Sequence, residues 1–389
     1  MNRLVTVSDE TTVVHQPKAH DSAIKHVTGR ALYVDDINEP AGLLHMYFGT
    51  SKTSHGRIRS MQLDKVRAAP GVVTVLTAAD IPGTNDISPK HTGDEEILAS
   101  EWVHFHGQVL FVIAAESRDA ARRAAQLAEV DIEELPAVLD IETAMRQKSW
   151  VDPPHEMKRG DPVRAIGAAK HRVSGEICTG AQDHFYLEGQ AALSIPQEDG
   201  DMLVYSSSQH PSELQHLAAM ALGRPDNAVT VEVRRMGGAF GGKETQAAQW
   251  AVITALVANQ TQRPAKLRLD RDDDMTSTGK RHDFRIRYEV GFDDAGRIEG
   301  IELELAARCG FSADLSGPIS DRAMFHSDNA YYLPNVRIKS YRCRTNTVSN
   351  TAFRGFGGPQ GMMGIERVID AIATHLGKDP LKVRKINFY

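Results

Sequence analysis

A glycine-rich stretch in the middle of the chain has residue types suited to holding an anionic ligand or cofactor. It runs from Gly237 to Glu244 and reads G-G-A-F-G-G-K-E. Glycines let the backbone approach a ligand closely, and the N–H groups at the start of a helix attract negative charge. A strand predicted over 229–233 leads into this stretch, and a helix predicted over 245–257 follows it. The sequence therefore predicts a cofactor-binding loop that opens a helix.

The same stretch differs from a nucleotide-binding P-loop at one decisive residue. A P-loop requires G-x-x-x-x-G-K followed by Ser or Thr, whose hydroxyl binds the magnesium ion. Gly237, Gly242 and Lys243 fit this pattern, but Glu244 occupies the hydroxyl position. Because a carboxylate at that position would repel phosphate groups, the sequence favours a cofactor other than ATP. A nucleotide-binding module is the weakest of the interpretations considered.

A second glycine-rich stretch has a similar composition. It runs from Arg354 to Gly361, reads R-G-F-G-G-P-Q-G, and also precedes a predicted helix. One such loop alone is more often a simple tight turn. Two loops that each combine paired glycines, an aromatic residue and an ionic side chain predict that one large anionic ligand is gripped from two sides.

Composition excludes several classes of protein. The chain has 389 residues, enough for two or more domains, and its net charge of −6 argues against a nucleic-acid surface. Cys178, Cys309 and Cys343 form no C-x-x-C pair, which argues against an iron–sulfur cluster or structural zinc in this chain and is typical of a reducing cytosol. Residues 1–16 contain no continuous apolar stretch, so we expect neither signal peptide nor membrane anchor. We expect a cytoplasmic protein with a disordered leader over 1–20.

The elements that must position the two loops belong to an α+β fold. In the first part, the apolar run 110–115 predicts a buried strand, Ser117 caps a helix, and 130–132 resumes a strand. The segment 152–162 is rich in proline and charge, and it is the predicted boundary between two domains. Further predicted elements are a strand over 202–207, a helix from Pro211 to Gly223, a β-hairpin over 284–305, a helix ending at Gly377 and a short helix beginning at Pro380.

Several motifs accompany the two loops, and together they resemble the molybdenum hydroxylase family. In chain order they are G-A-Q-D-H-F-Y-L-E-G-Q at 180–190, S-S-Q-H-P at 207–211, R-R-M-G-G-A-F-G-G-K-E at 234–244, D-R-D-D-D-M at 270–275, G-K-R-H at 279–282, D-R-A-M-F-H at 321–326 and N-T-A-F-R-G-F-G-G-P-Q-G at 350–361. The order and types are similar to those of the molybdenum-binding subunit of the xanthine dehydrogenases in this family, which also includes aldehyde oxidases.

The resemblance covers the chain from about residue 21 to its last residue and implies a domain organisation. H-V-T-G-R-A-L-Y-V-D-D-I at 26–37 looks like the start of the family's α/β hammerhead domain. The resemblance therefore implies a hammerhead domain over 21–150 and a mixed α/β first molybdopterin-binding domain over 163–389. The second molybdopterin-binding domain of the family has no counterpart in this sequence.

The resemblance also implies a cofactor and a reaction. In the family, hydroxide on the molybdenum of a molybdopterin cofactor attacks an electron-poor carbon, hydride passes to a sulfido group, and electrons leave through iron–sulfur clusters to FAD. By its motif, Gln209 hydrogen-bonds a molybdenum oxo group, while Phe240, Gly241 and Arg354 contact the molybdenum ligands or the pterin. An amide can donate to an oxo oxygen without adding charge, although such a glutamine is more commonly a polar helix cap. Molybdenum is then held only through the cofactor, near Gln209, Phe240 and Arg354.

A purine substrate is implied by three further residues. Glu244 and Arg322 match the family pair that binds a purine, because a carboxyl can bond a ring nitrogen and a guanidinium can stabilise charge on a purine oxygen. Aldehyde oxidases usually have apolar residues at both places, so this pair favours hypoxanthine or xanthine, oxidised toward urate, over an aldehyde. Phe356 matches an aromatic residue that packs on the flat ring. The plain alternatives are solvated surface charges and an aromatic residue of the core.

Two departures from the family pattern bear on activity. Ala239 replaces a glycine usual in the family, and its methyl group requires a backbone φ that is not positive. The family's catalytic glutamate lies in a G-x-G-E motif of the second half, and this chain contains no such string. We therefore assign no catalytic base and expect an N-terminal fragment or half of a split subunit, inactive alone.

The expected partners follow from the same resemblance. We expect a subunit carrying FAD and 2Fe-2S clusters, the missing C-terminal half, and a heteromeric assembly that dimerises, with no nucleic acid or membrane partner. The main alternative is a non-catalytic scaffold that keeps the fold and holds no cofactor. An aldehyde-oxidising relative is the other.

Overall fold

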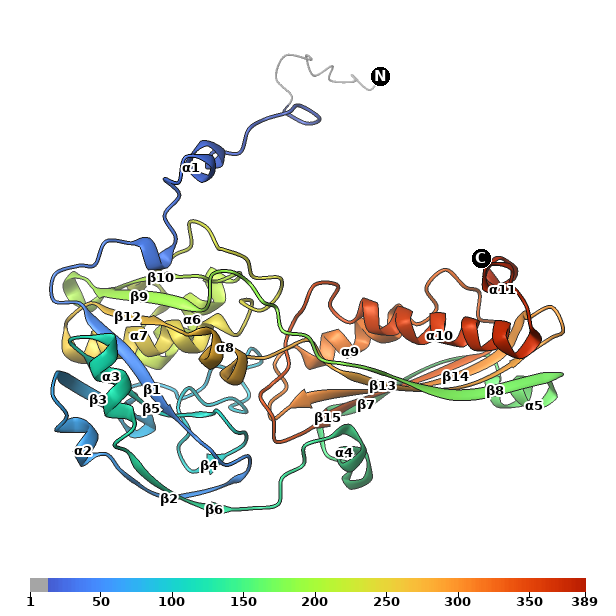
Figure 1. Cartoon of the computed structure of the whole chain (residues 1–389), viewed down its shortest axis with the longest axis horizontal. Helices are drawn as coiled ribbons and strands as arrows, with labels where there is room; N and C mark the ends of the chain where they lie inside the picture. The colour runs from blue at the N-terminus through green and yellow to red at the C-terminus, as the bar shows by residue number, and fades with distance from the viewer. Residues whose placement is uncertain (1–12) are drawn as a thin grey trace, which may run out of the picture.

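The computed structural model describes residues 13–389 as an elongated molecule with two lobes (Figure 1). Of the predicted leader, residues 1–12 lie outside the described residues, and residues 13–20 form turns and loop. The short helix α1 (Ala23–Val27) follows and stands away from the first lobe (Figure 1). Among the described residues, no helix has the length and apolar character needed to cross a membrane.

The first lobe is built around a seven-stranded sheet in the order β11-β10-β9-β12-β1-β5-β3. A parallel pairing of β1 with β12, in register Leu44↔Ala265, joins the early strands to the later ones. The strands are β1 (Leu44–Thr50), β3 (Val72–Thr77), β5 (Val109–Ala115), β9 (Ala191–Pro196), β10 (Met202–Ser206), β11 (Val229–Glu232) and β12 (Ala265–Arg268); a small sheet adds β2 (Gly56–Gln62), β4 (Trp102–Val103) and β6 (Glu129–Glu134).

Helices of the first lobe follow the sequence signals closely. The helix α6 (Pro211–Leu222) begins at the predicted proline and ends at Gly223, which has a φ of 65°. The helix α7 (Ala247–Thr261) is apolar almost all round, so it must be covered on most sides, and Trp250 on it is 1% exposed. The other helical segments here are α2 (Asp64–Arg67), α3 (Arg118–Ala125), α8 (Arg271–Ser277), η1 (Val34–Asp36), η2 (Ala78–Asp80), η3 (Glu198–Gly200) and η4 (Asp226–Ala228).

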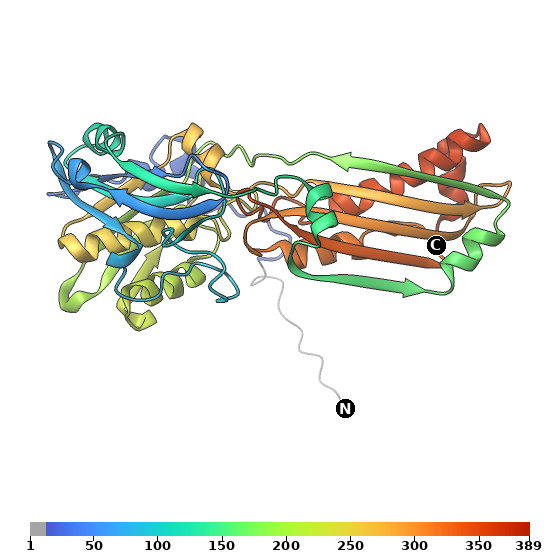
Figure 2. The same ribbon diagram turned by 90° about the horizontal axis from the view of Figure 1, so that it is seen from below.

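The second lobe is a five-stranded sheet in the order β7-β15-β14-β13-β8, with α9 and α10 along one face (Figures 1 and 2). The alternating apolar residues of β13 (Phe284–Phe292) are buried and pack with those of α10 (Gly358–Leu376), so the predicted hairpin of β13 with β14 (Ile298–Gly310) and the predicted helix are confirmed. The remaining elements are β7 (Trp150–Arg159), β8 (His171–Thr179), β15 (Val336–Arg344), α4 (Ile141–Gln147), α5 (Pro162–Ala168), α9 (Ser316–Phe325) and α11 (Pro380–Asn387).

The segment predicted as a boundary, 152–162, is mostly a strand. It supplies most of β7, which pairs antiparallel with β15 in register Val336↔Arg159. Because β7 is an edge strand, Pro153 and Pro154 can occur in it without interrupting a central ladder. The predicted boundary segment is therefore for the most part an exposed edge strand of the second lobe.

Strand pairing also cuts across the predicted division into 21–150 and 163–389. The strands β9 to β12 follow residue 163, yet they share the seven-stranded sheet with β1, β3 and β5. The lobes are therefore not consecutive pieces of sequence. The chain crosses between them more than once (Figure 2).

Candidate functional site

The two glycine-rich loops lie against each other where the lobes meet. The backbone N–H of Arg354 donates to the carbonyl oxygen of Phe240 at 2.9 Å. A Cβ atom on Gly241 would lie 2.6 Å from the carbonyl oxygen of Ala352, so the approach of the two backbones requires glycine there. The prediction that the two loops come together is confirmed, although they are separated by about a hundred residues of chain.

Both loops hold an aromatic residue in the left-handed backbone region. Phe240 has a φ of 56° and Phe356 a φ of 49°. Phe356 lies directly between Gly355 and Gly357, which both have positive φ, whereas Phe240 follows Ala239 and is followed by Gly241, which has a positive φ. Bulky residues rarely adopt this conformation, which costs of order 1–3 kcal/mol and is found mainly where the surroundings impose it. Ala239, in contrast, does not have a positive φ, so the backbone there accepts its methyl group, as the replacement of glycine requires. The loops are therefore strained at corresponding points.

Gln209 is fixed by the first loop. Its side-chain oxygen Oε1 accepts from the backbone N–H of Gly241 at 2.9 Å and from that of Lys243 at 3.3 Å. The backbone N–H of Gln209 donates to the carbonyl oxygen of Lys243 at 2.7 Å. Because two backbone donors occupy the oxygen, the orientation of the amide is set, and the NH₂ group makes no hydrogen bond among residues 13–389. Gln209 is exposed, and the residue that precedes α6 as its N-cap is His210 instead. Gln209 thus presents two N–H donors beside the first loop.

The helix after the first loop begins later than predicted. Residues 242–246 form turns, and α7 begins at Ala247, so the N-terminus of this helix does not open directly from the glycines. Thr245 is instead buried, with its hydroxyl 3.1 Å from that of Thr351. By contrast, α10 begins at Gly358, directly after Phe356. Only the second loop has the predicted loop-to-helix arrangement.

Lys243 is turned into the protein. Its side chain is fully buried, and Nζ donates to the carbonyl oxygen of Glu188 at 2.7 Å and to Oγ of Ser207 at 2.5 Å. The lysine of a P-loop must reach the phosphates of a bound nucleotide. An ammonium group in this position cannot do so, and the geometry contradicts a nucleotide-binding loop.

The predicted substrate residues lie on different elements. Glu244 is half-buried after the first loop, and burial raises the pKa of its carboxyl. Arg322 is exposed on α9 and, among the described residues, makes no ion pair; its Nε donates to Nε2 of His326 at 3.4 Å. The helix α9 packs against the second loop, since a Cβ atom on Gly357 would lie 2.0 Å from the carbonyl oxygen of Ile319. Among the described residues, no hydrogen bond or ion pair joins Glu244, Arg322 and Phe356, so their shared role stays a prediction.

A polar network under the first loop was missed from the sequence. The hydroxyl of Tyr186 donates to Asp274 at 2.7 Å, and the ammonium of Lys243 lies 4.6 Å from the centre of the Tyr186 ring. Glu188 accepts at Oε2 from the backbone N–H of Gly237 at 2.7 Å. Tyr186 and Glu188 lie in the motif 180–190, and Asp274 lies in the motif 270–275. The sequence carried one sign of this network, since these motifs contain several polar residues for which we expected no contact with a ligand.

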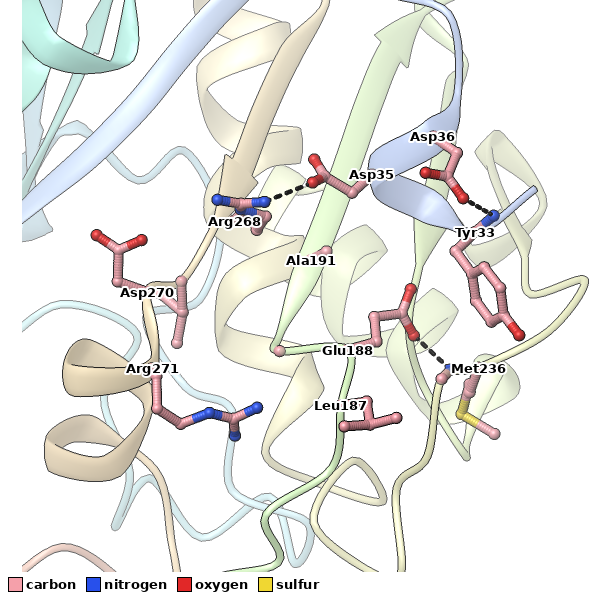
Figure 3. Close-up of a pocket in the computed structure, with 13 residues that line it drawn as sticks. Tyr33, Asp35, Asp36, Leu187, Glu188, Ala191, Met236, Arg268, Asp270 and Arg271 are labelled. Atoms are coloured by element: carbon pink, nitrogen blue, oxygen red, sulfur yellow. Dashed lines mark hydrogen bonds and ion pairs between the residues drawn. The ribbon is translucent and has the colours of Figure 1, made fainter. Parts of the chain in front are cut away.

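A cavity of about 740 Å³ adjoins the entry to the first loop (Figure 3). Its walls include Glu188, Gly237 and Arg268. The charges on the walls are largely paired: Arg268 contacts Asp35 at 2.7 Å, and Asp270 is paired with Arg118 and Arg122. Glu188 therefore connects this cavity with the underside of the first loop.

Comparisons with known proteins agree with this geometry. Residues 146–388 match the family described as molybdopterin cofactor-binding domain, and residues 28–136 match the a/b hammerhead domain of aldehyde oxidase and xanthine dehydrogenase. The chain is 42% identical over 376 residues to xanthine dehydrogenase of Dictyostelium discoideum and 40% identical over 377 residues to xanthine dehydrogenase/oxidase of Gallus gallus. Each alignment covers 97% of this chain and 28% of the relative.

Solved structures show the same fold. Aldehyde oxidoreductase from Desulfovibrio gigas superimposes with a TM-score of 0.86 at 28% identity, covering 95% of this chain and 43% of that one. The chain therefore belongs to the family of molybdopterin cofactor-binding domains, preceded by a hammerhead domain, and the predicted family and α+β fold class are confirmed. It spans about 28% of the length of the xanthine dehydrogenases that it matches.

Proposed function

We propose that this chain supplies the molybdopterin-binding face of a purine hydroxylase that oxidises hypoxanthine or xanthine toward urate. The observation that carries the proposal is the contact of the two strained glycine loops, with the Gln209 amide fixed beside them. Similarity to proteins named xanthine dehydrogenase supports the substrate class.

The residues at the loops fit such a cofactor. The free NH₂ group of Gln209 can donate to a metal-bound oxo group, and Gly241 leaves the backbone uncovered by any side chain. Arg354 is exposed and its backbone is anchored to Phe240, so its guanidinium can hold an anionic part of the pterin. When bound, the molybdenum cofactor supplies two-electron redox chemistry. The described residues contain no group of His, Cys, Asp and Glu suited to a metal ion, so we propose that the metal is held through the cofactor.

Substrate recognition falls to three residues in this proposal. Burial raises the pKa of Glu244, which favours a carboxyl that can donate as well as accept at a purine ring nitrogen. Arg322, exposed and without an ion pair among the described residues, can stabilise negative charge on a purine oxygen. Phe356 would stack on the ring.

Further segments complete the proposed enzyme. Since the chain spans 28% of its relatives' length, we propose that the catalytic base, the 2Fe-2S clusters and FAD come from other segments or subunits of a cytoplasmic heteromeric assembly that dimerises. On this proposal the chain alone does not turn over xanthine. Measurable xanthine turnover by the purified chain with cofactor would contradict that part.

The test of cofactor binding is Gln209→Ala in the native assembly, with molybdenum content and xanthine turnover measured together. We expect a loss of at least about 10-fold in turnover, because an oxo ligand would lose its donor. The matched control is Gln215→Ala, since the side-chain amide of Gln215 on α6 bonds the carbonyl of Val229 at 2.7 Å. Unchanged molybdenum content and turnover in Gln209→Ala would favour a scaffold without cofactor.

An aldehyde substrate is the second candidate, favoured by the similarity to the aldehyde oxidoreductase structure. The double variant Glu244→Val with Arg322→Leu separates the two. A purine hydroxylase should lose xanthine turnover by orders of magnitude while aldehyde turnover persists or rises. An aldehyde oxidase should show little xanthine turnover even before the substitutions. The double variant should then show no selective loss of xanthine turnover relative to aldehyde turnover.

A further inference from the structure

We propose that Glu188 and Lys243 form a clamp that holds the first glycine loop in its strained shape and thereby positions Gln209 and Gly241. The clamp is a set of contacts within this chain, and only its purpose rests on the proposed function. Neither residue is assigned a ligand or catalytic role above.

Lys243 has all three ammonium hydrogens engaged. Its side chain is 0% exposed, and Nζ lies 2.7 Å from the Glu188 carbonyl oxygen, 2.5 Å from Ser207 Oγ and 3.3 Å from Glu188 Oε2. An ammonium group can donate three hydrogen bonds, so this set is complete. The aromatic face of Tyr186 at 4.6 Å adds a further favourable contact.

Glu188 binds the opposite end of the loop. Its Oε2 accepts from the backbone N–H of Gly237 at 2.7 Å and from Ser207 Oγ at 2.6 Å. Gly237 is the first residue of the loop, and Lys243 is near its end. The ion pair therefore fastens both ends of the loop from below, and Ser207 at the end of β10 ties the pair to the sheet.

The clamp and the orientation of Gln209 share one residue. The backbone N–H and carbonyl of Lys243 are both bonded to Gln209, while its side chain is bonded to Glu188. A shift of Lys243 must therefore move the Gln209 amide and the Gly241 N–H that binds it. Between these points lies Phe240, whose positive φ persists only if its surroundings hold it.

A buried ion pair is better suited to fixing a conformation than to adding stability. Removing two charges from water is costly, and burial lowers the pKa of Lys243 while Glu188 opposes that effect. If the first lobe needed only close packing at this position, two apolar side chains of similar volume would fill the space. The charged pair instead specifies one arrangement of the loop N–H groups, which an apolar pair cannot do.

The test is hydrogen exchange in the full chain without cofactor. In Lys243→Met we expect amide exchange of the peptide 237–244 to accelerate at least about 10-fold, while exchange in α7 changes less than about 2-fold. The matched control is Lys266→Met, which removes another buried lysine of the first lobe, one that contacts Asp35 at 3.0 Å. It should leave exchange of 237–244 within about 2-fold of the unmodified chain.

Glu188→Gln serves as a second variant of nearly the same shape, and it decides the matter if Lys243→Met does not fold. It should accelerate exchange of 237–244 by at least about 3-fold, and reduce molybdenum content in the native assembly. Exchange that rises equally in 237–244 and α7 would show a merely structural pair and overturn the proposal, as would unchanged exchange.

The failure of the clamp and the failure of the proposed function give different results. If Gln209→Ala lowers molybdenum content but both clamp variants leave loop exchange unchanged, the function stands and the clamp is wrong. If loop exchange rises as expected while molybdenum content and xanthine turnover are both unaffected in Gln209→Ala, the clamp stands and the proposed cofactor contact is wrong.

Discussion

The two glycine-rich loops have the same backbone feature and are held by different means. In each, a phenylalanine with positive φ is followed by a glycine with positive φ. The first loop is held by side chains, those of Glu188, Lys243 and Gln209. The second is held by close backbone packing, since a Cβ atom on Gly361 would lie 2.1 Å from the carbonyl oxygen of Ala323 on α9.

Two loops with a similar sequence and a similar backbone conformation can therefore be held in place by different kinds of contact. The side chains keep one hydrogen-bonding arrangement of the first loop, but hydrogen bonds to long side chains can lengthen or rotate slightly, so this loop can yield a little to a steric clash without losing that arrangement. Contacts between backbones cannot yield in this way without moving a helix. We therefore expect the second loop to be the fixed wall of the site and the first loop to be the adjustable one.

The largest expected effect is that of Gly357→Ala in the second loop. Gly357 has a φ of 89°, and a Cβ atom there would lie 2.0 Å from the Ile319 carbonyl oxygen, so both conformation and packing oppose the change. We expect the free energy of unfolding in urea to fall by more than about 3 kcal/mol. The control Gly377→Ala has a φ of 62° with nothing within 4 Å and should lose about 1 kcal/mol. Equal losses would contradict the packing argument.

A smaller loss is expected for Gly241→Ala in the first loop. Its φ is 101°, and the nearest atom to the added Cβ would be the Ala352 carbonyl oxygen at 2.6 Å. If the first loop is adjustable, part of this clash is relieved, and unfolding free energy should fall by about 2 kcal/mol. Urea unfolding at matched conditions measures it. A loss as large as that of Gly357→Ala would remove the proposed difference between the loops.

Two buried groups behind the loops should respond to pH with opposite signs. Burial raises the pKa of Asp314, whose Oδ2 accepts from Gln246 after the first loop, to about 7. Burial lowers the pKa of His282, whose backbone carbonyl accepts from the side chain of Gln360 in the second glycine-rich stretch, to about 3. The stability that Asp314 contributes is present below its unfolded pKa of 3.8 and is lost as pH rises through about 7. That of His282 is present above 6.5 and is lost as pH falls toward about 3.

Acidification from about pH 7 to about pH 5 should therefore stabilise the fold through Asp314, whose charge interacts with the carboxyl of Glu95, and destabilise it through His282. In Asp314→Asn, acidification over this range should lower the unfolding free energy by about 2 kcal/mol relative to wild type. In His282→Gln, it should raise it by about 2 kcal/mol. Urea unfolding at both pH values tests this, and slopes of the same sign in the two variants would refute the assignment.

The smallest effect is expected for Phe240→Asn. The side chain is 49% exposed, and asparagine tolerates a positive φ better than phenylalanine does. We expect a change of less than about 0.5 kcal/mol in unfolding free energy, whereas Phe356→Asn, at a less exposed position, should cost more. A large loss in Phe240→Asn would show that its ring contributes to the core.

Local signals predicted most of the elements. The proline at 211 and the glycine at 223 bound α6, because one fixes a helical φ and the other adopts the left-handed φ of a C-cap. The alternation from Phe284 identified β13, because residues two apart share a face. The start of α7 was placed too early, since Thr245 makes a tertiary hydrogen bond to Thr351 that no local pattern records.

The amino-acid sequence alone was enough to find both glycine loops, to predict the family of the chain, and to name the residues that we expect to contact a cofactor. Three features could be seen only in the folded chain: the hydrogen bond between Arg354 and Phe240, the Lys243 ammonium that faces inward to Glu188, and the pairing of β12 with β1. The physical reason is range: turn and helix preferences depend on neighbours along the chain. Strand pairing and buried ion pairs depend on which distant segments packing brings together.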